Sequence, residues 1–268
     1  MKKYYMLIFT IITILVCLIL LFVVNKVNLL EVSSNAISNN EKISWGLKRE
    51  TNNKQPTLYK PHTDVLDKNN GIYLGNSQDK YLYLTFDEGY ENGYTEKILD
   101  VLKENQVSAA FFITGDYLKT SPDIVKRIID EGHILGNHTQ THPSLPKLAN
   151  QSKIENELKS LEEKINNEYG YKMKYFRPPM GEYSDYSLNI INNLGYTTVM
   201  WSFAYDDWNV DNQKGIEYAK DKIISNLHPG SIILLHAVSK DNANVLDYVI
   251  KEARKQGYEF KSLDEFKK

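Results

Sequence analysis

The chain has 268 residues, of which 42% are hydrophobic and 25% charged, and its formal net charge is −2. This composition is typical of a globular protein and excludes a disordered or collagen-like chain. Because 32 basic residues stand against 34 acidic ones, there is no positive excess to neutralise phosphates, and we expect no nucleic-acid partner. The single cysteine, Cys17, excludes an internal disulfide and a cysteine-rich zinc site, so any metal must be held by histidines and carboxylates.

The first predicted element is a membrane-spanning helix. No charged residue occurs from Met6 to Val24, and about 19 residues in a helix extend roughly 28 Å, close to the thickness of the bilayer core. A cleaved signal peptide has small residues soon after its apolar core, whereas Ser34–Ala36 follows too late. We expect residues 1–26 to be a single-pass anchor in the cell membrane, with the catalytic part on the extracytoplasmic side, or secreted if the segment is cleaved.

The chain then divides into two further parts. Residues 27–77 are rich in Asn, Ser and Lys and are expected to form a linker that becomes an ordered lead-in around Ile43–Leu47, with no element assigned. Residues 78–268 alternate short β-rich runs with amphipathic stretches. Strands are predicted at Tyr81–Phe86, Ala109–Thr114, Ile134–Asn137, Tyr175–Pro178, Thr197–Trp201, Ser231–Leu235 and Tyr258–Lys261. Helices are predicted at 93–104, 122–131, 150–168, 185–194, 214–227 and 242–256.

This alternation of strands and helices predicts a parallel sheet. About six or seven units in roughly 190 residues are too few for a full eight-fold barrel. We therefore expect an α/β fold with an irregular or incomplete (β/α) barrel, and an open doubly wound sheet is the alternative.

Polar side chains recur where the predicted strands end. They are Asp87-Glu88 after the first strand, His138 and His142 after the third, Arg177 in the fourth, Asp207-Trp208 after the fifth and His236 after the sixth. The carboxyl ends of parallel barrel strands converge on one rim, where barrel enzymes keep their active sites. The pattern predicts one site assembled from these residues.

The spacing of His138 and His142 is the first chemical signal. Residues at i and i+4 share a face of a helical turn, and two neutral imidazoles with one carboxylate form a catalytic zinc site. Glu88 or Asp87 could supply that carboxylate, and two solvated loop histidines are the alternative. The other histidines are expected to be structural or solvated: His62, His133 and His228.

The remaining strand-end groups suit hydrolysis of an unactivated amide, which needs a base and an acid for the departing amine. Asp87 could be the base, held ionised by Arg177, and His236 the acid, oriented by Asp207. Taken singly, each residue has another explanation. Asp87 could start a turn, Asp206-Asp207 could be a solvated loop pair, and Arg177 could form a structural ion pair. Together at strand ends, they favour catalysis.

Five ordered motifs of the chain resemble those of the polysaccharide deacetylase (NodB-homology) family, over residues 78 to 265. They are Thr85–Gly89, His138-x-x-x-His142, Arg177-Pro178-Pro179-x-Gly181, Asp207-Trp208 and Leu234–His236. Four longer strings resemble one branch, the delta-lactam-biosynthetic de-N-acetylases: Trp45-Gly46, Tyr90–Thr95, Asn212–Gly215 and Ser239–Ala243. That branch removes the acetyl group from N-acetylmuramic acid in spore-cortex peptidoglycan, the step before muramic δ-lactam formation in sporulation.

The resemblance implies a role for each matching residue. The implied catalytic residues are the base Asp87, its orienting partner Arg177, the acid His236 and its tuner Asp207, and the implied ligands of a divalent metal, expected to be zinc, are His138, His142 and Glu88. Trp208 and Leu234 match the pocket for the acetyl methyl, and the Met180 N–H matches an oxyanion donor. The family has aspartate where this chain has Glu88, so Glu88 either still ligates the metal or leaves it held more loosely.

Three functions remain open. The first is a membrane-anchored muramic acid deacetylase acting on peptidoglycan glycan strands, with Lys240 as a rim contact for the lactyl carboxylate and Met180 as an uncharged wall. The second is the same chemistry on N-acetylglucosamine of peptidoglycan or another glycan. The third is an inactive glycan-binding relative that has lost its metal.

Overall fold

The computed structural model describes residues 6, 13–24, 26 and 39–267. Residues 13–24 are helical, and none of the described helices has the length and apolarity that crossing a membrane requires. The predicted transmembrane helix is therefore not supported by the described residues, and residues 7–12 of that expected span lie outside them. A separate folded unit begins at Lys42 and holds all the elements that follow.

A parallel sheet of seven strands forms the centre of this unit, in the order β10-β4-β5-β6-β7-β9 with β11 beside β4. Its strands are β4 (Tyr81–Glu88), β5 (Ala110–Ile113), β6 (Ile134–Asn137), β7 (Tyr175–Phe176), β9 (Thr197–Thr198), β10 (Ser231–His236) and β11 (Glu259–Phe260). All seven predicted strands are confirmed. β4 is longer than predicted and includes Asp87 and Glu88.

The sheet curls instead of staying open. Phe203, which follows the edge strand β9, forms a parallel bridge with Ile233 of β10 at the other end of the strand order. Ile72 bridges Val199 in the same region. The predicted incomplete barrel is confirmed as a curled half-barrel, and the doubly wound alternative is wrong.

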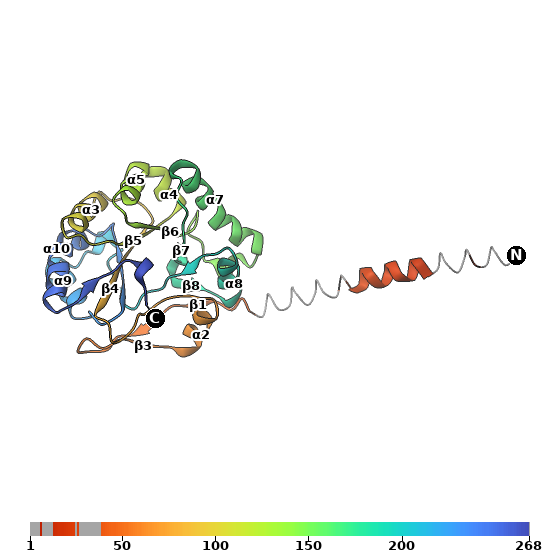
Figure 1. The fold of residues 1–268 in the computed structure, drawn as a ribbon, viewed down its shortest axis with the longest axis horizontal. Coiled ribbons are helices and arrows are strands. Elements are labelled where there is room, and N and C mark those ends of the chain that lie inside the picture. Colours follow the sequence, from red (N-terminus) through yellow and green to blue (C-terminus); the bar gives the residue numbers. More distant parts are fainter. Residues whose placement is uncertain (1–5, 7–12, 25, 27–38, 268) are drawn as a thin grey trace. The chain divides into compact units, whose positions relative to one another are not determined.

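Helices surround the strands (Figure 1). In the described chain beyond residue 78 they are α3 (Thr95–Glu104), α4 (Gly115–Thr120), α5 (Pro122–Asp130), α6 (Leu145–Leu148), α7 (Gln151–Tyr169), α8 (Asp185–Asn193), α9 (Ile216–Ile224) and α10 (Lys240–Lys255). The six longer ones confirm the predicted helices. The side chains of Asn150 and Ser239 accept hydrogen bonds from backbone N–H groups in the first turns of α7 and α10, which fixes where these helices begin.

Alternate residues of β4 face two different cores. Leu82, Leu84 and Phe86 belong to the larger core, between the sheet and the helices, whereas Tyr83 belongs to a smaller core inside the curl of the sheet. Because successive strand side chains point to opposite faces, Asp87 lies on the inner side with Tyr83. Glu88 lies on the helix side.

The lead-in before residue 78 is ordered, as expected around Ile43–Leu47, and it contains regular elements that were not predicted from the sequence. It contains β1 (Ile43–Ser44), β2 (Leu47–Lys48), β3 (Thr57–Leu58) and α2 (Lys60–Lys68). β1 pairs antiparallel with β8 (Glu182–Tyr183), and the Trp45 N–H donates to the Gly181 carbonyl. β1 depends on a partner more than 100 residues away, and β2 pairs with the nearby β3. Each of these strands is only 2 residues long, so local sequence gave little sign of them.

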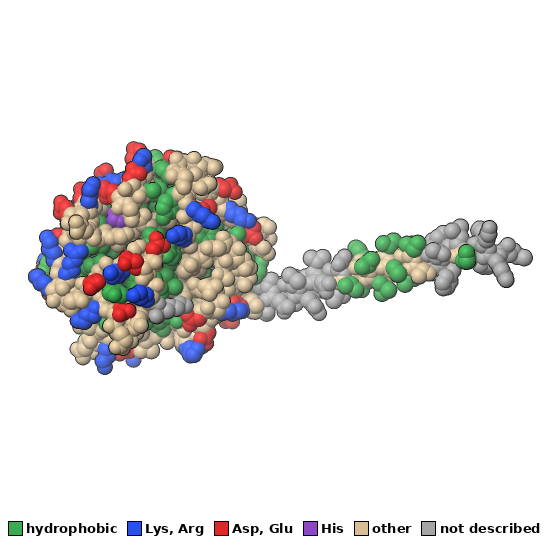
Figure 2. Space-filling view, viewed as in Figure 1, with side chains coloured by type: hydrophobic (Ala, Val, Ile, Leu, Met, Phe, Trp, Pro, Cys, Tyr) green, Lys and Arg blue, Asp and Glu red, His purple; other side chains and the backbone are tan. Residues whose placement is uncertain are grey.

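The surface agrees with the balanced composition. On the face that Figure 2 shows, Lys and Arg side chains are interspersed with Asp and Glu side chains. This face therefore presents no field of a single sign to a polyanion.

Candidate active site

A cavity of about 850 Å³ lies where the strand ends converge. It is lined by seven residues singled out from the sequence: Asp87, His138, His142, Met180, Trp208, Leu234 and His236. Arg177 and Asp207 are buried behind its wall. The structure thus brings together the strand-end groups that the topology predicted.

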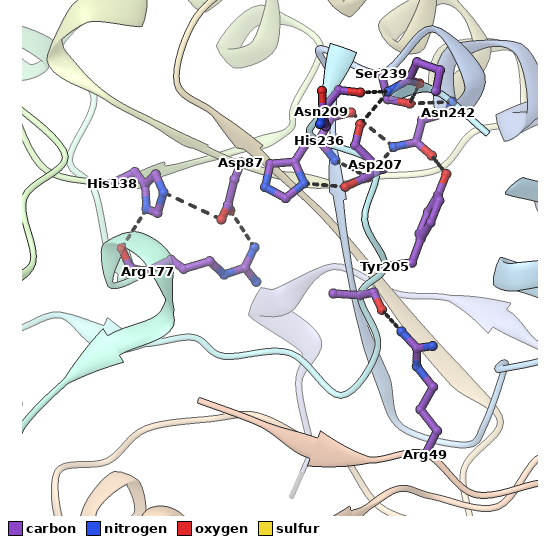
Figure 3. A network of polar contacts seen from close by, with 12 residues as sticks. Arg49, Asp87, His138, Arg177, Tyr205, Asp207, Asn209, His236, Ser239 and Asn242 are labelled. Atoms are coloured by element: carbon purple, nitrogen blue, oxygen red, sulfur yellow. Dashed lines mark hydrogen bonds and ion pairs between the residues drawn. The ribbon is translucent and has the colours of Figure 1, made fainter. Parts of the chain in front are cut away.

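One side of the cavity is built on Asp87 (Figure 3). Its Oδ1 accepts a hydrogen bond of 2.7 Å from Nη1 of Arg177, whose side chain has no exposed surface. The Arg177 guanidinium also donates from Nε to the Val199 carbonyl and stacks 4.2 Å from the centre of the Phe112 ring. Burial by itself would raise the pKa of Asp87, but the charge of Arg177 and the neighbouring imidazoles outweigh burial and lower it. Asp87 is therefore ionised and suited to accept a proton.

A second part of the site is built on His236, the register partner of Asp87 on the neighbouring strand β10. Its Nδ1 lies 2.7 Å from Oδ1 of Asp207, and its backbone N–H donates to the other carboxylate oxygen. Asn242 donates to Asp207 and accepts from the Tyr205 hydroxyl, so the carboxylate is fixed on both oxygens (Figure 3). Burial would lower the pKa of His236, but Asp207 outweighs it and raises the pKa. The raised pKa favours the protonated form of His236, the form that a general acid needs.

His138 and His142 form a pair of uncharged imidazoles. Their ring centres are 4.8 Å apart, and burial lowers the pKa of both, that of His138 to about 4. Nδ1 of His138 lies 2.8 Å from the Arg177 carbonyl, so this nitrogen donates and Nε2 carries the free lone pair. Neutral imidazoles oriented by a backbone carbonyl are the form that ligates metals.

Glu88 does not join this pair. Among the described residues, no group of three His, Cys, Asp or Glu side chains could hold a metal ion, so the predicted set of Glu88, His138 and His142 is not assembled. The reason is strand geometry: Glu88 points to the helix side, where both its carboxyl oxygens are buried without a hydrogen-bond partner. Burial, with Glu91 and Asp87 nearby, raises its pKa well above the usual value. The nearest carboxylate is Oδ2 of Asp87, 3.6 Å from His138 Nε2.

Met180 lies at the mouth of the cavity in an unusual backbone conformation. It is in the 3-10 turn η1 (Pro179–Gly181) with a φ of 59°, a left-handed value that costs a non-glycine residue roughly 1 kcal/mol. Gly181, also left-handed, packs against Trp201, where a Cβ would come within 2.8 Å of the indole. The turn therefore holds the Met180 backbone at the cavity, as an oxyanion donor requires. Trp208 and Leu234 line the same cavity.

Lys240 does not line the cavity, which corrects its prediction as a rim contact. Lys240 is the first residue of α10, and its side chain is exposed. Sequence reasoning missed Arg49, which does line the cavity, because no element was expected in the lead-in. It also missed the hydrogen bond between Tyr205 and Asn242, a contact across 37 residues that no local pattern indicates.

Taken together, the cavity has an ionised carboxylate, Asp87, beside an imidazole, His236, whose raised pKa favours its protonated form. These are the base and the acid that hydrolysis of an amide needs. The exposed Trp208 and Met180 at its mouth suit contact with a sugar ring.

Comparison with known proteins agrees with this geometry. A family model described as polysaccharide deacetylase matches residues 74–199, which include Asp87, His138 and Arg177. The peptidoglycan-N-acetylmuramic acid deacetylase PdaA of Bacillus subtilis is 49% identical over 228 residues, 84% of this chain and 86% of that protein. A peptidoglycan-N-acetylglucosamine deacetylase of Bacillus cereus is 37% identical over 67% of this chain and 66% of that protein. The solved structure of Bacillus subtilis PdaA, a family 4 carbohydrate esterase, superposes with a TM-score of 0.82 at 48% identity, covering 85% of this chain and 97% of that one.

Proposed function

The chain belongs to the polysaccharide deacetylase family, and we propose that it hydrolyses the N-acetyl group of N-acetylmuramic acid residues in peptidoglycan. The observation that carries the proposal is the cavity that unites the Asp87–Arg177 pair with the His236–Asp207 pair. Its specificity for muramic acid is supported by 49% identity to a muramic acid deacetylase over most of both chains.

The two pairs divide the chemistry between them. Asp87 accepts a proton from the water that attacks the acetyl carbonyl, and Arg177 keeps the carboxylate ionised and oriented. The Met180 N–H faces the oxygen on which negative charge develops. His236 then gives its proton to the sugar nitrogen as the carbon–nitrogen bond breaks, and acetate and a free amine are released.

A divalent metal is expected, because deacetylases of this family generally depend on one. We propose zinc, bound by Nε2 of His138 and by His142, since both imidazoles are neutral. Without Glu88 as a third ligand, we expect the ion to dissociate readily. Metal analysis after dialysis against micromolar zinc should find zinc in the wild type and none in His142→Ala. Equal zinc in both proteins would refute this assignment.

The biological setting is also a proposal. The motif strings shared with the delta-lactam branch favour a step toward muramic δ-lactam in the spore cortex. Peptidoglycan lies outside the cytoplasm, so we propose an extracytoplasmic catalytic unit. A reporter enzyme fused to the C-terminus should show its activity only on the outer side of the membrane.

A second candidate function is deacetylation of N-acetylglucosamine in peptidoglycan, favoured by the 37% identity to the Bacillus cereus enzyme. Incubating the protein with peptidoglycan glycan strands, digesting them and locating free amines by mass spectrometry would distinguish the two. We expect amines on muramic residues. Amines mainly on glucosamine would support the second candidate, and an unchanged glycan with metal present would indicate an inactive glycan-binding relative.

A further inference from the structure

Arg49 is the one lysine or arginine among the described residues that lines the cavity. It follows β2, whose strand pairing with β3 anchors this part of the lead-in. Figure 3 shows its side chain extending from the lead-in toward Tyr205 and the Asp207 network. A cation therefore reaches the active site from a segment outside the barrel.

The guanidinium is held in place but is not neutralised. Nη2 donates a hydrogen bond of 2.5 Å to the Ala204 carbonyl, and the group packs 5.7 Å from the centre of the Phe203 ring. No ion pair joins Arg49 to an acid in the part of the chain that the structure describes. Since a guanidinium carries five N–H donors, most of them remain available to a ligand.

The other charges of the cavity restrict where an anion could bind. Asp87, Asp116 and Asp206 also line it, and a carboxylate near any of these acids would be repelled. Arg177, the other arginine of the site, has no exposed surface and is paired with Asp87. Among the described side chains that line the cavity, Arg49 is thus the cation outside the catalytic acid–base set, and a negative group can bind there without occupying His236.

We propose that Arg49 binds the lactyl carboxylate of a muramic acid residue whose peptide has been removed, and so selects peptide-free strands. The proposal rests on the proposed function. In a peptide-bearing residue this carboxylate is consumed in an amide bond and carries no charge. N-acetylglucosamine has no lactyl group at all, so the same contact distinguishes the two sugars of the strand. An arginine suits a carboxylate because its planar donors match the two oxygens.

The test compares two forms of one substrate. Peptide-free glycan strands are used either with free lactyl carboxylates or with these carboxylates converted to primary amides. The variants are Arg49→Gln, which removes the charge, and Arg49→Lys, which keeps it. Lys48→Gln, an exposed neighbour that does not line the cavity, is the matched control.

Arg49→Gln should raise KM for the carboxylate strands about fivefold, the size expected of a partly exposed ion pair. It should leave kcat within about twofold and the KM for the amide strands unchanged. Arg49→Lys should restore part of the loss, and Lys48→Gln should match the wild type. Equal loss on both substrates, or no loss on either, would overturn the role of Arg49.

The same assay separates this proposal from the one on which it rests. If the wild type deacetylates muramic residues but Arg49→Gln keeps the wild-type KM on both strand forms, only the role of Arg49 fails. If the wild type frees amines on glucosamine alone, the proposed function fails and the role of Arg49 fails with it.

Discussion

Asp87 and Glu88 are adjacent on β4, yet they lie in opposite surroundings. Asp87 faces the cavity, is paired with Arg177, and has a lowered pKa. Glu88 faces the helices, has no hydrogen-bond partner for either oxygen, and has a strongly raised pKa. Both are buried, so burial alone does not decide whether a carboxyl group is ionised.

The partners available on each side of the strand account for the difference. On the inner side, one guanidinium and two imidazoles approach Asp87 and outweigh the loss of hydration. On the helix side, the nearby Glu91 is itself an acid and is already occupied by Thr95 and Tyr117. We therefore assign proton transfer to the inner side, whereas on the helix side the raised pKa of Glu88 favours its neutral form.

Replacing the inner carboxylate should have the largest effect. Asp87→Asn keeps the shape but removes the proton acceptor, and we expect kcat to fall by about 10² to 10⁴-fold. Acetate release measured on peptide-free glycan strands tests this, and the thermal transition should stay cooperative. Loss of that transition would instead assign Asp87 a structural role.

Replacing the partner of the acid should have a smaller, pH-dependent effect. Asp207 raises the pKa of His236, so activity that needs protonated His236 declines only as pH rises through this raised value. In Asp207→Asn burial still lowers that pKa, and the decline should begin at a lower pH, with kcat reduced about 10- to 100-fold near pH 8. A pH–rate profile identical to that of the wild type would contradict the assignment.

Replacing the carboxyl group on the helix side should change stability with pH and have the smallest effect on activity. Because the folded-state pKa of Glu88 is raised, its contribution to stability is complete at low pH and is lost as pH rises toward that pKa. Gln cannot ionise. As pH rises through that window, the free energy of unfolding of Glu88→Gln should therefore increase relative to that of the wild type, by up to about 1.4 kcal/mol per pH unit. Denaturant unfolding from about pH 5 to about pH 8 measures this, and a constant difference would contradict the raised pKa.

The sequence predicted the barrel and the strand-end site because both depend on strong local signals. Runs such as Ser231–Leu235 and the helices between them indicated the topology, and the topology brought Asp87 and His236 to one rim. The sequence did not predict which side of the sheet Glu88 faces, because β4 is buried on both faces and shows no polar alternation. Arg49 was missed because its position depends on contacts with residues far along the chain.

One measurement tests most directly whether the inner side of β4 performs the reaction. Wild type, Asp87→Asn and Glu88→Gln are incubated with the same peptide-free glycan strands, and free amines on muramic residues are counted by mass spectrometry. We expect amines with the wild type and with Glu88→Gln, and almost none with Asp87→Asn. Full activity in Asp87→Asn, or its loss in a folded Glu88→Gln, would contradict this expectation.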